Sequence, residues 1–139
     1  MSEPQDNLWQ THSLKFLEAA FRTDRHERLH NADGRGSKAR DCGDTIEFFI
    51  LLKGNCIHAM AYQLNGCINT NACANALIDL AEGSTLARAW EISPEEVAAA
   101  LESLPGDHFH CAELVIGAFY SALADVRRNL QAPWKKLYR

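Results

Sequence analysis

The stretch CGDTIEFFILLKGNCIHAMAYQLNGC, residues 42–67, contains the two most strand-like runs of the chain. Every even position of residues 45–52 is apolar, which predicts a β-strand whose even face lies on the core. Residues 56–65 form the second predicted strand, and Gly54 and Asn55 mark the turn between them. We expect a three-residue loop, 53–55, because it keeps the even faces of both strands on the same side. In the second strand, Met60, Tyr62 and Leu64 are the side chains predicted to be buried.

The predicted hairpin also places chemistry-bearing residues together. Antiparallel pairing across a three-residue loop sets Asp44 opposite Leu64, at the end of the sheet where Gly66 follows the second strand. Cys42 and Cys67 each lie just beyond that end. The sequence therefore predicts that these two thiols are neighbours in space, with a carboxylate beside them.

The remainder of the chain is mostly helical in pattern. Apolar spacing and capping residues predict helices over residues 8–22, from Asn69 or Thr70 to Gly83, over 85–90, from Ser93 to about 104, and over 110–129. Cys111 falls in the first turn of the last helix, where the helix dipole and unpaired amides favour a thiolate. The fold class expected is α+β, a small antiparallel β-sheet packed against several helices. The pattern does not place a third strand.

Length and composition narrow the domain organisation. The 139 residues predict one domain. Residues 23–41 hold five basic and four acidic side chains with few apolar ones, and so predict an exposed loop. Residues 130–139 are read as a basic C-terminal tail.

Charge and cysteine usage exclude some function classes. A formal net charge of −4 argues against a nucleic-acid partner. No apolar run approaches the ~20 residues of a membrane span, and no secretory signal is visible, so we expect a cytoplasmic protein without a membrane partner. Five cysteines in that compartment point to metal binding or catalysis more than to disulfides. Cys56 and Cys73 are interpreted as small buried hydrophobes.

The other three cysteines, Cys42, Cys67 and Cys111, lie at element boundaries and are joined by Asp44 and His110. A structural zinc site usually shows paired CxxC-type spacing, and this chain contains no CxxC. Three thiolates completed by a carboxylate or an imidazole hold metal less firmly than four thiolates do. Such a donor set suits an iron–sulfur cluster that is built and then released.

These motifs resemble a known family. Cys42-Gly43-Asp44, Gly66-Cys67, Gly83, Leu104-Pro105 and His110-Cys111 occur in the order and at the spacing of the IscU / NifU N-terminal family, over roughly residues 14–128. The resemblance implies an IscU/SufE-like fold and an iron–sulfur cluster assembly scaffold, a carrier and not an enzyme. Such a scaffold accepts sulfur from a cysteine desulfurase, holds a labile [2Fe-2S] cluster and transfers it to apoproteins.

The resemblance also implies a ligand set, which is Cys42, Asp44, Cys67, His110 and Cys111, with Asp44 and His110 exchangeable. Iron is the implied metal, and zinc also binds at this site in family members. Cys111 and Cys67 are both candidates to accept persulfide sulfur. Cys111 is the more plausible from its helix start, although the sequence does not settle the order.

Two features depart from the family. Gly106-Asp107-His108-Phe109 replaces the usual chaperone recognition segment, which puts a partnership with a heat-shock ATPase chaperone in doubt. His108 takes the place of a family lysine and is either an exposed loop histidine or a further metal ligand. Two rival functions stay open, a SufU-like zinc-dependent sulfurtransferase and a small zinc-stabilised interaction module. The compact interval between Cys67 and Cys111, together with His110, favours the scaffold.

Overall fold

The computed structural model describes residues 13–40, 43–104 and 106–132. The elements, in chain order, are α2 (Leu14–Phe21), β1 (Gly34–Ala39), β2 (Thr45–Lys53), β3 (Cys56–Asn65), α3 (Ile68–Ala81), α4 (Leu86–Ala89), α5 (Pro94–Leu101), the 3₁₀ turn η1 (Gly106–His108) and α6 (Phe109–Gln131). The strands form one antiparallel sheet in the order β1-β2-β3. The α+β class expected from the sequence is confirmed.

The β2–β3 hairpin keeps the even faces together by a different route from the one expected. Lys53 pairs with Cys56, so the loop has two residues and not three. A bulge at His58 then restores the parity, because Leu52 pairs with Ile57 and Leu51 with Ala59. The shorter loop and the bulge each move the register by one residue, so that Ile46 and not Asp44 is opposite Leu64 at the far end. Asp44 is consequently level with Gly66.

Part of the expected exposed loop 23–41 is a third strand. β1 pairs along β2, and its Gly34 and Gly36 are buried. A Cβ added to Gly34 would lie 2.8 Å from the backbone oxygen of Ala122, and one added to Gly36 would lie 2.5 Å from the carbonyl carbon of Ser121. Helix α6 therefore lies directly on the backbone of β1. The sequence pattern did not predict this strand, because its other residues are mostly polar or charged. Its buried positions are glycines, which carry no apolar side chain to mark a core face.

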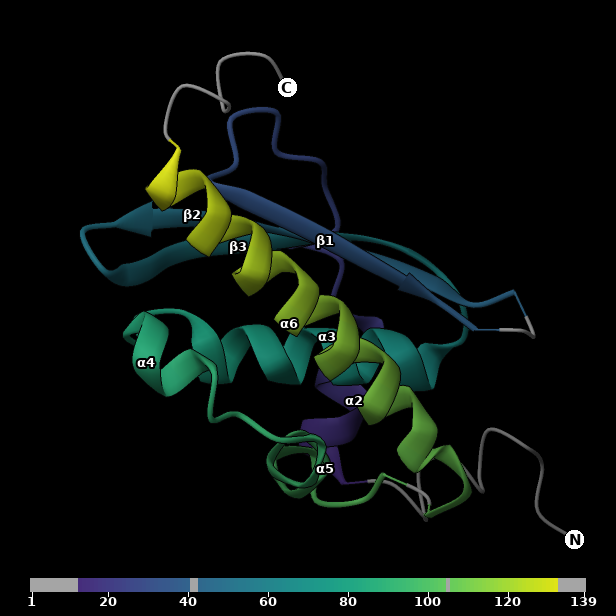
Figure 1. The fold of residues 1–139 in the computed structure, drawn as a ribbon. Helices are drawn as coiled ribbons and strands as arrows, with labels where there is room; N and C mark the ends of the chain where they lie inside the picture. Colours follow the sequence, from purple (N-terminus) through teal and green to yellow (C-terminus); the bar gives the residue numbers. More distant parts are fainter. Residues whose placement is uncertain (1–12, 41–42, 105, 133–139) are drawn as a thin grey trace, which may run out of the picture.

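Helices α6 and α3 carry the core. Figure 1 shows α6, in green to yellow, running diagonally over β1 and β2, with α3, in teal, crossing behind it. Helices α2 and α5 pack against α3 on the side away from the sheet. The largest buried side chains come from the strands and these helices, and include Phe16, Ile46, Phe48, Ile50, Tyr62, Leu77 and Phe119. This arrangement brings the starts of α3 and α6 to the same region as the start of β2.

Two asparagines join α2 to α3. Asn71 donates from Nδ2 to the carbonyl oxygens of Ala20, at 2.8 Å, and Arg22, at 2.9 Å, while Asn75 donates to that of Ala19 at 2.8 Å. The last carbonyls of a helix have no partner within the helix, so these bonds complete the end of α2. Asn71 and Asn75 therefore have a structural role.

Helix α6 is an exception to the expectation that no apolar segment approaches the length of a membrane span. It is the one helix among the described residues that is long and apolar enough to span a membrane by length and composition alone. Of its most apolar stretch, 56% is buried inside the protein. A core helix can have the same length and composition as a membrane-spanning one.

Candidate metal centre

The carboxylate of Asp44 lies where β2 begins and β3 ends. Arg40 N donates to Asp44 O at 2.8 Å and Gly43 N donates to Arg40 O at 2.9 Å, so a tight turn joins β1 to β2. Gly43 has a φ of 99°, which a residue with a Cβ rarely adopts. The Asp44 side chain rests against Gly66, where an added Cβ would lie 3.3 Å from its carboxyl carbon. Asp44 is thus held beside the residue that precedes Cys67.

Cys42 precedes Gly43 in the sequence and lies outside the described residues. Its predicted closeness to Cys67 therefore stays a prediction.

Cys67 is the N-cap residue of α3 and is exposed. The helix begins earlier than expected, since Asn69 and Thr70 lie within its first turn. Partial burial raises the pKa of the Cys67 thiol, but the Thr70 hydroxyl and the amide groups of Thr70 and Asn69 outweigh it, and the pKa lies below its ordinary value. The Thr70 oxygen is 3.6 Å from the Cys67 sulfur. An exposed sulfur at a helix N-terminus can act as a nucleophile.

Cys111 differs sharply from Cys67, although each lies at a helix start. It is 0% exposed, and this burial raises the pKa of its thiol despite the opposing effects of the Thr70 hydroxyl and Arg40. The sequence-based expectation that its helix position favours a thiolate is wrong for the metal-free protein, because desolvation outweighs the helix dipole. Cys67 adds to the rise in the pKa of Cys111, so the two side chains are near one another. Thr70 thus lies against both sulfurs.

Of the other two described cysteines, Cys73 is a buried hydrophobe as expected, whereas Cys56 is only partly buried. Cys73 is 0% exposed in α3, and its burial raises its pKa strongly, with the neighbouring Cys111 and Cys67 adding to the effect. Cys56 begins β3 at the opposite end from Gly66 and is half-buried. All four described cysteines are free thiols.

Three donors converge at the start of α6. His108, His110 and Cys111 each place one ligand atom within 4.8 Å of the others. His108 is half-buried in the turn η1, so it is not an exposed loop histidine. Imidazole nitrogen and thiolate sulfur are ligands that zinc and iron both accept, so these residues fit a metal or an iron–sulfur cluster.

Basic side chains missed by the sequence analysis surround His110. Lys38, Arg40, Glu113 and Leu114 line a hollow of about 270 Å³ with it. The positive charge of Arg40 acts to lower the pKa of Cys111, but burial has the larger effect and the pKa is raised overall. Lys38 and Arg40 belong to the predicted loop 23–41, and the pairing of β1 with β2 brings them beside His110.

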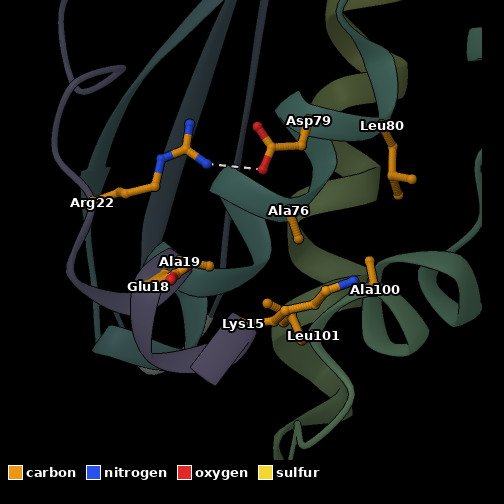
Figure 2. A pocket seen from close by; sticks show the side chains of 9 residues that line it. All are labelled: Lys15, Glu18, Ala19, Arg22, Ala76, Asp79, Leu80, Ala100 and Leu101. Atoms are coloured by element: carbon orange, nitrogen blue, oxygen red, sulfur yellow. Dashed lines mark hydrogen bonds and ion pairs between the residues drawn. The ribbon is translucent and has the colours of Figure 1, made fainter. Parts of the chain in front are cut away.

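A second hollow, of about 290 Å³, lies between α2, α3 and α5 (Figure 2). An ion pair between Arg22 and Asp79, at 2.8 Å, lies at its rim, and Lys15 and Glu18 add further charges. Its floor includes Ala76 and Leu101. Its described lining includes neither cysteine nor histidine.

The thiols, imidazoles and carboxylate at the element ends of this small antiparallel sheet are donor types that suit a thiolate-seeking metal or cluster. The model of the NifU-like N-terminal domain matches residues 22–132. Two proteins of Archaeoglobus fulgidus, the iron–sulfur cluster assembly scaffold proteins IscU 1 and IscU 2, are each 32% identical over 103 residues, or 73% of this chain and 67% of theirs. The chain belongs to the NifU-like N-terminal domain family, as its motifs predicted.

Solved structures confirm the IscU/SufE-like fold. A NifU-like N-terminal protein of Brucella abortus has a TM-score of 0.70 at 12% identity, covering 89% of this chain and 97% of that one. FiSufU of Fervidobacterium islandicum, described as a scaffold of the SUF system, has a TM-score of 0.68 at 17% identity, covering 82% and 97%. At these identities the likeness shows the fold alone.

Proposed function

We propose that this protein is an iron–sulfur cluster assembly scaffold. It accepts sulfur from a cysteine desulfurase, assembles a labile [2Fe-2S] cluster on Cys42, Cys67 and Cys111 with Asp44 or His110, and transfers it to apoproteins. The observation that carries the proposal is the closeness of an exposed and a buried thiol, Cys67 and Cys111, at one end of the sheet. Membership of the family and the scaffold relatives support it.

Sulfur transfer requires a thiol that a bulky donor protein can reach. Cys67 is exposed and Cys111 is not, which supports Cys67 as the first acceptor. The Cys67 thiolate attacks the outer sulfur of the donor's cysteine persulfide. The donor's S–S bond breaks, a new S–S bond forms on Cys67, and the donor cysteine leaves as a thiolate, so no electrons are gained or lost overall.

Building the cluster also needs electrons. Reduction of two sulfane sulfurs to sulfide takes four electrons, and oxidation of two ferrous ions to ferric ions supplies two. We assign the other two to an external one-electron donor. The free cysteines support a reducing compartment such as the cytoplasm.

Asp44 is proposed to keep the cluster labile. A carboxylate binds iron less firmly than a thiolate and lets a competing thiol replace it. We expect Asp44→Ala to lengthen the lifetime of a reconstituted cluster and to slow its transfer to an apo-ferredoxin, both followed by visible absorption and circular dichroism. Asp79→Ala, which removes an exposed carboxylate of the distant hollow, is the control and should change neither rate. An unchanged or faster transfer by Asp44→Ala would contradict this role.

The alternative is a SufU-like zinc-dependent sulfurtransferase, which the structural likeness to FiSufU keeps open. Anaerobic reconstitution with ferrous iron, cysteine and a cysteine desulfurase separates the two functions. The absorption of a [2Fe-2S] centre, lost in Cys67→Ser and Cys111→Ser, supports the scaffold. Tight zinc with sulfur turnover and no cluster supports the enzyme, and tight zinc with neither supports an interaction module. The departure of Gly106–Phe109 from the family's recognition segment argues against a heat-shock ATPase chaperone as a partner. An increase in the ATPase rate of such a chaperone on adding this protein would show that it is a partner.

A further inference from the structure

The donors at the start of α6 belong to one short piece of backbone. His108 ends η1, and His110 and Cys111 follow it in the first turn of α6. Cys67 is carried by α3 and Asp44 by the β1–β2 turn. Three donors on one segment can hold an ion without any movement between elements, whereas recruiting Cys67 requires two helices to act together.

His108 has an unmet hydrogen-bonding group. Its Nδ1 atom is buried and has no hydrogen-bond partner among the described residues. A buried polar atom without a partner costs free energy, and native structures usually pair such atoms with protein, water or an ion. The ring of His108 lies 5.7 Å from that of His110, between centroids, at an interplanar angle of 45°. The two imidazoles are neighbours but not stacked.

The distances are close to those of a metal site. Zn–N bonds of about 2.0–2.1 Å and Zn–S bonds of about 2.3 Å place tetrahedral ligand atoms roughly 3.3–3.6 Å apart. The three ligand atoms already lie within 4.8 Å of one another, so rotations of side chains suffice to close the site. Two imidazoles and one thiolate suit zinc(II) and iron(II), whereas magnesium and calcium require oxygen ligands.

We propose that His108, His110 and Cys111 form a first binding site for a single iron(II) or zinc(II) ion, with His108 as a direct ligand. The site fills while Cys67 stays free, so metal and sulfur reach the centre through different residues. The inference rests on the proposed function, because it names the residues that receive the metal used there.

Cobalt(II), a spectroscopic substitute for zinc(II) and iron(II), tests the site in the full-length chain. The background is Cys42→Ser combined with Cys67→Ser, which leaves Cys111 as the thiol of the centre. We expect one cobalt ion per chain, with a thiolate-to-cobalt charge-transfer band. Adding His108→Ala should weaken cobalt and zinc binding by about tenfold or more, measured by competition with a chromophoric chelator.

A matched control and a count of ligands make the test specific. His58→Ala removes the exposed bulge histidine of β3 and should leave the affinity unchanged. Each cobalt-bound imidazole retains one exchangeable N–H proton with a large hyperfine shift in the NMR spectrum. We expect two such signals, and one after His108→Ala. His108→Gln, which keeps a polar side chain of similar size, should behave as His108→Ala does and guards against a folding artefact.

The outcomes separate this inference from the proposed function. Unchanged cobalt affinity in His108→Ala, or a single shifted N–H signal before the substitution, overturns the role of His108 even if the wild-type chain assembles a cluster. Tight cobalt binding with two shifted signals, in a chain that forms no cluster, overturns the scaffold and leaves the metal site standing. Failure of the Ser/Ser background to bind cobalt at all overturns a site that is independent of Cys67.

Discussion

At the scale of single residues, two cysteines at helix starts have opposite properties. Cys67 is exposed at the N-cap of α3, while Cys111 is buried in the first turn of α6. Both lie at a helix N-terminus, but only Cys111 is fully buried. Burial therefore decides which thiol reacts with a molecule from solution.

This contrast predicts the order of alkylation in the metal-free protein. Iodoacetamide should modify Cys67 at least tenfold faster than Cys111, because the reagent reaches an exposed sulfur whose thiolate is favoured and not a desolvated one. Mass spectrometry of peptides after timed quenching measures both rates in one sample. Cys73, which is equally buried, serves as the internal reference and should react as slowly as Cys111. Equal rates at Cys67 and Cys111 would contradict the assignment of Cys67 as first sulfur acceptor.

At the scale of elements, the contact between α6 and β1 positions one side of the centre. Gly34 and Gly36 let the helix backbone lie on the strand, which sets the start of α6 near Arg40. The two glycines are needed for close approach, and neither has a positive φ. A side chain here would move α6 as a unit.

Gly36→Ala tests this contact. The added Cβ would overlap Ser121 and Ala122, and overpacking of this kind typically costs about 1–3 kcal/mol. We expect the free energy of unfolding in urea to fall by about 2 kcal/mol or more. Ser37→Ala, at the adjacent exposed position of β1, should change it by less than about 0.5 kcal/mol. A neutral Gly36→Ala would mean that α6 does not pack on this strand as described.

At the scale of the whole molecule, the centre connects parts that are far apart in sequence. Its described members come from the β1–β2 turn, the start of α3 and the start of α6. In the proposed function, the complete donor set joins these elements around bound metal only in the folded chain. Metal binding should therefore raise the stability of the entire domain.

Thermal unfolding with zinc measures this linkage. At a zinc concentration 100 times Kd, binding to the folded state alone adds about 2.7 kcal/mol. For a chain of this size we expect Tm to rise by roughly 5–10 °C in calorimetry. Cys56→Ser, far from the centre, should keep the shift, and Cys111→Ser should lose most of it. The same shift in both variants would place the ion elsewhere.

Much of the fold and the site follows from local pattern. Alternation in residues 45–52 predicts β2, the Ser93 cap predicts α5, and the order of the cysteine motifs predicts the family. These signals are carried by residues close together in the chain, and each reflects a local preference or a local chemical requirement.

Other features depend on contacts that no local pattern records. The strand β1 is recognisable only once α6 lies against its glycines, and Arg40 joins the centre only through that strand. The His58 bulge sets Asp44 level with Gly66, although no residue of the turn predicts it. The sequence by itself determined the family, the α+β class and the candidate donors. The tertiary structure alone decided that Cys67 is exposed and Cys111 is buried, because burial depends on which other parts of the chain pack over a residue.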